Sequence, residues 1–119
     1  MKIAVTSTGI DLDAQVDPRF GRAAYILIVD SATLDYELID NKENVNALKG
    51  AGIQAARMIS EKKADVLLTG FCGPNAFKVL EAANIGVANN AEGSVRDAVK
   101  AYQNGKLALA DEANVEGQW

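Results

Sequence analysis

The hydrophobic period of this chain changes near residue 50, and this change restricts the possible folds more than any other feature. Before it, three short apolar runs have strand character, over residues 2–7, 25–30 and 36–41. After it, stretches with helical spacing alternate with short apolar strands. Three strands followed by alternating helices and strands predict a mixed sheet with helices on both faces.

The connections between these elements predict the order of the strands. A short link after residue 30 makes the second strand antiparallel to its neighbours, whereas helical crossovers make the fourth and fifth strands parallel to the first. We therefore expect an α/β fold of the ribonuclease H-like, three-layer kind, with a mixed five-stranded sheet of order 3-2-1-4-5 and an antiparallel second strand. The other predicted elements are a polar loop over 42–49, helices over 50–63, 75–84 and 94–104, and strands over 65–69 and 85–88.

The sequence contains no histidine and a single cysteine, Cys72. It therefore has no imidazole ligand for a metal and no Ser-His or Cys-His nucleophile pair. A lone thiol excludes an internal disulfide and fits a reducing compartment. The N-terminal stretch turns polar too early for a secretory signal, and no apolar run reaches the roughly 20 residues that span a bilayer. We expect a cytoplasmic binding protein that is neither an enzyme nor a membrane protein.

Charge is unevenly distributed along the chain. The net charge of −4 argues against nucleic acid as a partner, because a phosphate backbone needs a basic surface. From residue 107 to 119 there are three acidic residues and no basic one, so the rest of the chain is nearly neutral. We expect one binding domain over residues 1–105 and an acidic tail over 106–119.

One edge of the expected sheet collects positive charge. Four strands end there, so three helices begin there with unpaired N–H groups and the positive ends of their dipoles. The first and fourth strands diverge at that edge, which is the switch point where open α/β sheets bind ligands. The loop over 8–22 reaches the same edge with Arg19 and Arg22. These features together predict a pocket for an anion.

Two glycine-containing helix starts and two aromatic residues complete the predicted pocket. The glycines allow the backbone to approach a ligand closely, and the phenylalanines offer apolar walls. A plainer interpretation is that the arginines pair with nearby aspartates, the glycines only shape turns, and the phenylalanines belong to the core. The predicted binding residues from these motifs are Gly50, Gly52, Gly73, Asn75, Phe20 and Phe71.

Cys72 has two interpretations. Most free cysteines are small buried hydrophobes. A thiol just before a helix N-terminus can instead have a lowered pKa and act as a soft metal ligand or a reactive group. We keep Cys72 as a candidate binding residue and the one candidate metal ligand.

Several motifs resemble the dinitrogenase iron–molybdenum cofactor biosynthesis family, and among its stand-alone members the orange protein type. The match runs from residue 2 to 105 with the motifs in order. It rests on Ile-Ala-Val-Thr at 3–6, Asp-Pro-Arg-Phe-Gly-Arg-Ala at 17–23, Gly-Ala-Gly-Ile-Gln-Ala-Ala at 50–56, Leu-Thr-Gly at 68–70 and Gly-Pro-Asn-Ala at 73–76.

The resemblance implies a ribonuclease H-like fold that carries or assembles a metal–sulfur cluster. In the orange protein type this is a molybdenum–copper sulfide held without covalent attachment, and related members handle iron–molybdenum clusters. Such clusters are polyanions, which fits the positive edge with Arg19 and Arg22. Carrier members use histidine for cluster binding. Because this chain has none, Cys72 would be the only thiolate available.

Other functions remain open at this stage. The same edge could serve a small phosphate- or nucleotide-binding regulatory protein. A ribonuclease H-like nuclease needs carboxylates near the first and fourth strands, but the first strand has none and Asp65 lies at the far end of the fourth. We expect a monomer or weak homodimer, with a protein partner for cluster transfer.

Overall fold

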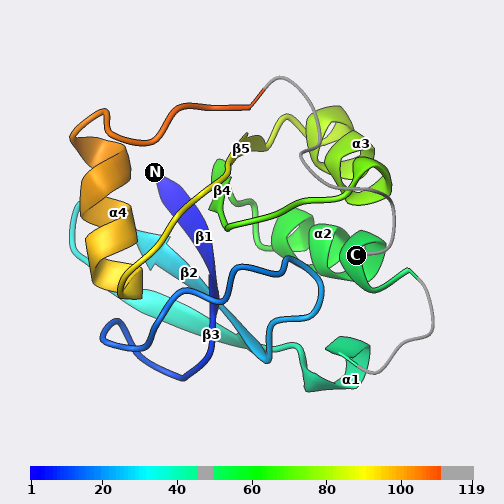
Figure 1. Cartoon of the computed structure of the whole chain (residues 1–119), viewed down its shortest axis with the longest axis horizontal. Coiled ribbons are helices and arrows are strands. Elements are labelled where there is room, and N and C mark those ends of the chain that lie inside the picture. Colours follow the sequence, from blue (N-terminus) through cyan, green and yellow to red (C-terminus); the bar gives the residue numbers. More distant parts are fainter. Residues whose placement is uncertain (46–49, 111–119) are drawn as a thin grey trace.

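A five-stranded sheet forms the middle layer of the molecule (Figure 1). The computed structural model describes residues 1–45 and 50–110. The strands are β1 (Lys2–Ser7), β2 (Tyr25–Asp30), β3 (Tyr36–Asp40), β4 (Val66–Leu68) and β5 (Gly86–Ala88). β1 pairs antiparallel with β2 and parallel with β4, while β3 joins β2 antiparallel and β5 joins β4 parallel. The order β3-β2-β1-β4-β5 confirms the predicted mixed α/β sheet with an antiparallel second strand.

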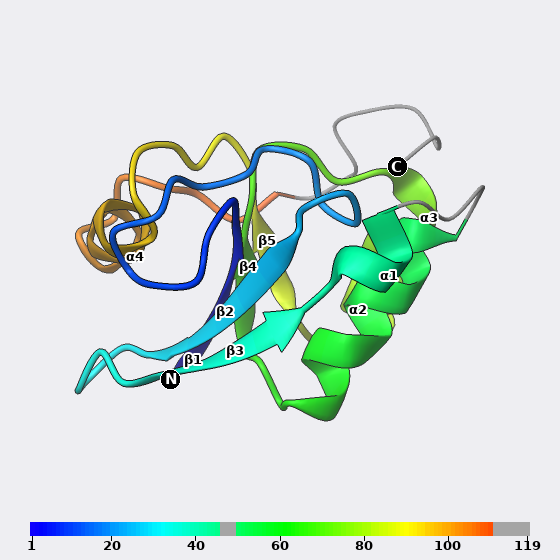
Figure 2. The ribbon, with the colours of Figure 1, turned by 90° about the horizontal axis from the view of Figure 1, so that it is seen from below.

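Helices cover both faces of this sheet. They are α1 (Lys42–Val45), α2 (Ala51–Glu61), α3 (Pro74–Ala82) and α4 (Val95–Gln103). Figure 2 shows α4 on one side of the sheet and α1, α2 and α3 on the other. The three longer helices match the predicted ones, whereas α1 lies in a stretch predicted to be a loop. No helix in the described part of the chain is long and apolar enough to cross a membrane.

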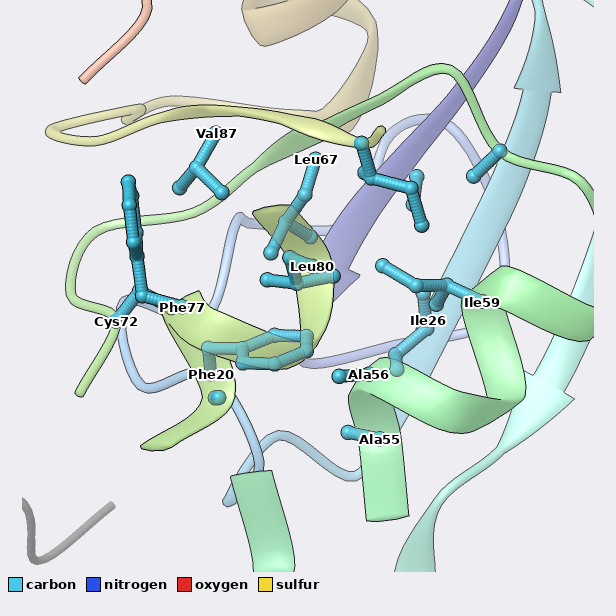
Figure 3. Close-up of a cluster of buried hydrophobic side chains, with 14 of the residues drawn as sticks. Phe20, Ile26, Ala55, Ala56, Ile59, Leu67, Cys72, Phe77, Leu80 and Val87 are labelled. Atoms are coloured by element: carbon cyan, nitrogen blue, oxygen red, sulfur yellow. The ribbon is translucent and has the colours of Figure 1, made fainter. Parts of the chain in front are cut away.

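The alternation of side chains along β1 divides the interior into two cores. Ala4 packs into the core beneath α2 and α3, whereas Ile3 and Val5 pack into the core beneath α4. On α2 the small residues Ala55 and Ala56 face the sheet and let the helix backbone lie close to it. Figure 3 shows this first core, where side chains of α2 and α3 meet those of β2 and β4.

The two outer strands of the sheet differ in what lies beside them. After α4 the chain returns to β5, where Leu109 pairs with Ala88 and the Ala110 N–H donates to the Val87 carbonyl at 2.7 Å. β3 forms the opposite border and pairs only with β2. The edge at which β1, β3, β4 and β5 end, called here the carboxyl edge, is the one where the sequence predicts the anion pocket.

Candidate functional site

The arginine loop, residues 17–22, lies at the carboxyl edge against the turn before α3. The Phe20 N–H donates to the Phe71 carbonyl at 3.2 Å, and the Phe71 N–H donates to the Pro18 carbonyl at 2.6 Å. These bonds join the loop and the turn as a short parallel bridge. The structure thus brings together two motifs that lie some fifty residues apart in the sequence.

The other side of the arginine loop touches the start of α2. Gly21 has a φ of +92°, and a Cβ added there would lie 2.7 Å from the Gly52 nitrogen and 2.8 Å from its Cα. Backbone therefore meets backbone, a contact that only glycine permits at position 21. Together with the bridge to Phe71, this contact fixes the arginine loop between the starts of α2 and α3.

A buried polar network ties the arginine loop to the ends of β1 and β4. The Asp17 N–H donates to the Thr6 carbonyl at 3.0 Å, and the Thr6 hydroxyl donates to the Asp17 carbonyl. The Thr6 Oγ1 also lies 2.9 Å from the Thr69 Oγ1. Both threonines are fully buried where neighbouring parallel strands diverge. This network sets the point at which the loop leaves the sheet.

The starts of α2 and α3 are open, because glycine occupies both N-cap positions. Gly50 caps α2 and Gly73 caps α3, so neither N-cap residue has a side chain that could accept a hydrogen bond. No cap side chain therefore competes with a ligand for the N–H groups of the first turn, which in α3 begin at Asn75 because Pro74 has none. The positive ends of both helix dipoles lie at this edge. Of the predicted residues, Gly52 and Gly73 are buried, Gly50 is half-buried, and Asn75 is exposed in the first turn of α3.

The start of α4 differs, and the prediction of three open helix starts is wrong on this point. Ser94 and Asp97 form a capping box. The first two N–H groups of the helix are also hydrogen-bonded. The Val95 N–H donates to the Ala14 carbonyl and the Arg96 N–H donates to the Leu12 carbonyl, each at 2.9 Å. Two helix starts, not three, remain to attract an anion at this edge.

The two arginines of the loop differ in their surroundings. The Arg19 side chain is 52% exposed, and its Nε lies 3.4 Å from the Oδ1 of Asp17, whose side chain is 7% exposed. The same Oδ1 accepts the Arg19 N–H at 3.0 Å. Arg22 is half-buried and bonded within the protein. The expected pairing of Arg19 with an aspartate therefore occurs, while Asp13 pairs instead with Arg96 of α4.

The three apolar candidates fall into two groups. Phe20 is fully buried in the core beneath α2 and α3, as Figure 3 shows, so its ring belongs to the core and not to a ligand wall. Phe71 is 38% exposed at the turn before α3 and can form an apolar wall.

Cys72 also belongs to the core, and the possibility of a lowered pKa is wrong for it. Burial raises the pKa of the Cys72 thiol to about 12, so the thiol stays protonated at neutral pH. Full burial and a raised pKa both disfavour the thiolate form that a metal requires, so the geometry does not support Cys72 as the predicted metal ligand. Over residues 1–45 and 50–110, no group of three or more cysteines or carboxylates could hold a metal ion.

A cavity of about 340 Å³ lies beside the site, and the sequence did not predict it. Asn90 links it to the turn before α3, because the Asn90 N–H donates to the Gly70 carbonyl at 3.2 Å. The Oδ1 of Asn89 is buried and has no hydrogen-bond partner in the described part of the chain. In the sequence, the sign of this cavity is a pair of asparagines directly after a buried strand. The lining residues are Asn89, Asn90, Lys106, Leu107, Ala108 and Ala110.

Comparisons with known proteins identify the family to which the chain belongs. The sequence profile described as dinitrogenase iron-molybdenum cofactor matches residues 1–105. The chain belongs to this family. The solved apo form of the orange protein from Desulfovibrio gigas is 45% identical, with 96% of each chain covered and a TM-score of 0.93. No curated protein sequence matches.

Two further solved structures show how widely the fold is shared. A protein from Thermotoga provisionally assigned as NifB is 30% identical over 98% of each chain, with a TM-score of 0.83. A protein from Methanocaldococcus jannaschii provisionally described as a dinitrogenase is 16% identical, and 94% of this chain aligns with 96% of that one at a TM-score of 0.69. The second likeness shows the fold alone.

Proposed function

We propose that this protein binds and carries an anionic molybdenum-containing metal–sulfur cluster, either a molybdenum–copper sulfide or a cluster like the iron–molybdenum cofactor. One observation carries the proposal: the arginine loop lies between two glycine-capped helix starts. Family membership and the likeness to the orange protein support the same class of ligand. The role is binding in the cytoplasm, with transfer to a protein partner, and not catalysis.

The strength of the available interactions favours a ligand with several negative charges. Each open helix start contributes about 0.3–1 kcal/mol to binding an exposed anion and about 2 kcal/mol when partly buried. Exposed arginines add similar amounts. A micromolar complex needs about 8 kcal/mol, so a monovalent ion falls short. A polyanion engages both helix starts and both arginines with several charges at once, so it gains more from each of them and comes closer to that value than a monovalent ion does.

The donor set also favours a cluster that brings its own sulfur ligands. The sequence contains no histidine, and its one thiol is buried and protonated at neutral pH. The site therefore offers N–H groups, guanidinium groups and the exposed ring of Phe71, which suit a preformed sulfide anion.

The proposal is tested by adding tetrathiomolybdate and cuprous ion, removing unbound reagents, and measuring the visible absorption that stays with the protein. We expect the wild-type protein to retain a coloured complex, and the double variant Arg19→Ala/Arg22→Ala to bind at least about tenfold more weakly. Arg96→Ala is the matched control, because it removes another arginine paired with an aspartate, on α4. Cys72→Ala should bind like the wild type.

Two outcomes would count against this function. One is equal binding by the wild type and the double arginine variant, which would place the ligand elsewhere. The other is displacement of the complex by inorganic phosphate or a nucleotide at equal concentration. Open helix starts also bind phosphate, so that result would favour the regulatory alternative.

A further inference from the structure

Asn41 is a buried polar residue that holds the backbone on both sides of Arg22. It directly follows β3 and is 1% exposed. Its Nδ2 donates to the Gly21 carbonyl at 3.2 Å and to the Ala23 carbonyl at 2.8 Å. Its backbone N–H donates to the Ala24 carbonyl at 2.9 Å. One residue therefore donates hydrogen bonds to three backbone carbonyls of the segment that carries Arg22.

The orientation of the Asn41 amide is itself fixed. Its Oδ1 accepts a hydrogen bond from the Nδ2 of Asn44 at 2.9 Å. The amide thus uses both of its N–H donors and its oxygen acceptor, and the reversed orientation would set its oxygen against two carbonyl oxygens. Because buried polar groups without partners are costly, this amide has one favourable arrangement.

The hydrogen bonds of Asn41 hold the backbone from which the Arg22 side chain extends. The Gly21 carbonyl belongs to the peptide unit just before Arg22, and the Ala23 carbonyl belongs to the second unit after it. The Arg22 N–H donates to the Arg19 carbonyl at 3.1 Å. The backbone is thus held on both sides of Arg22, which restricts the Cα–Cβ direction of that residue. Without Asn41, two carbonyls would lose their donor, and the loop could turn about Gly21.

We infer that Asn41 is the positioning residue for Arg22, and that it holds the anion site in its binding geometry before any ligand arrives. The inference rests on the proposed function of the site. Asp17 has the corresponding role for Arg19, since its Oδ1 accepts both the backbone N–H and the Nε of that residue. Each arginine therefore has its own anchor, so a change at Asn41 should act mainly through Arg22.

The test is a double-mutant cycle on the affinity for tetrathiomolybdate with cuprous ion. We expect Asn41→Ala to weaken binding severalfold. In the Asn41→Ala background, Arg22→Ala should cost at least about threefold less affinity than it costs in the wild type. Arg19→Ala should cost nearly the same in both backgrounds. If Asn41 only stabilised the fold, Arg19→Ala and Arg22→Ala would each cost the same affinity with and without the Asn41 change.

Two additional variants keep the test decisive. If Asn41→Ala does not fold, Asn41→Ser replaces it in the same cycle, because serine retains one hydroxyl donor. Asn44→Ala separates the two layers of this arrangement: it removes the hydrogen bond to the Asn41 Oδ1 but leaves both Asn41 bonds to the loop, so it should weaken binding less than Asn41→Ala does. If the wild type binds the cluster but the affinity losses of Asn41→Ala and Arg22→Ala are additive, the inference about Asn41 is overturned and the proposed function still stands. Failure of the wild type to bind would overturn the proposed function instead.

Discussion

The two halves of the loop between β1 and β2 make different contacts with the helix starts beside them. Its first half closes the start of α4, because the carbonyls of Leu12 and Ala14 accept the first N–H groups of that helix. Its second half, the arginine loop, lies between the starts of α2 and α3, and in the described part of the chain no bond from it to their first N–H groups is seen. A helix N-terminus can bind a ligand only through donors that the protein itself leaves unused.

Local sequence accounts for much of this difference. α4 begins with Ser94 and carries Asp97 three residues later, so the helix satisfies its own donors and places a carboxylate at its positive end. α3 begins with Gly73 and Pro74, which supply no side-chain acceptor. One start therefore stabilises the fold, and the other is open to an anion.

The largest effect is expected from breaking the contact between the arginine loop and α2. Gly21→Ala places a Cβ 2.7 Å from a backbone nitrogen and forces a side chain into positive φ. We expect the free energy of unfolding to fall by about 2 kcal/mol or more, and cluster binding to fall with it. Urea unfolding and the absorption assay measure the two effects.

Gly50→Ala is the matched control for this change. Gly50 also has a positive φ, of +80°, but a Cβ there meets nothing within 4 Å. Only backbone strain of about 1 kcal/mol should remain. Equal losses for the two variants would mean that the close contact of Gly21 with α2 contributes nothing.

A smaller effect is expected from opening the closed helix start. Ser94→Ala removes the hydroxyl that accepts the Asp97 N–H at 3.0 Å. We expect the free energy of unfolding to fall by about 1 kcal/mol, with cluster affinity unchanged. Urea unfolding measures the first quantity. A loss of affinity would show that α4 contributes to the site after all.

The smallest effect is expected from closing an open start. Gly73→Ser gives α3 an N-cap hydroxyl in a backbone conformation that suits it, with φ −74° and ψ 166°. The hydroxyl would compete with a ligand for the first-turn donors and should weaken cluster binding by about two- to fivefold. Binding titrations measure this change. An unchanged or higher affinity would remove α3 from the proposed site.

The fold could be predicted because its information is local in the sequence. The change of period near residue 50, the short link after Asp30 and the apolar runs of β1 and β2 are enough to give the strand order. The capping box at Ser94 is also local, because its two residues are only three positions apart. The same topology predicted that the arginine loop lies at the carboxyl edge, beside the turn before α3, and the structure has it there.

The details of the site depend on contacts between distant residues, which a single sequence does not show. Leu12 and Ala14 could not be assigned to the start of α4 before the path of the loop was known. Phe20 and Phe71 are chemically alike, and only packing separates the buried ring from the exposed one. Burial in the core raises the pKa of Cys72, and this burial could not be deduced from its place before a helix.

Asn41 and the cavity beside Asn89 were missed for the same reason. Asn41 stands among polar residues and gives no sign in the sequence that its amide is buried. The cavity forms only when the chain after α4 returns to β5.

That return also has a consequence for how copies of the protein behave in a crowded solution. A sheet border with unpaired backbone groups can add strands from another chain, which is a route to aggregation. The segment at Leu109 covers the β5 border, so β3 offers the longer free border in the described part of the chain. β3 carries Glu37 and Asp40 in its five residues. These carboxylates pair with Lys62 and Lys42, and such charged side chains keep water at the border and oppose stacking where the fold is otherwise most open to it.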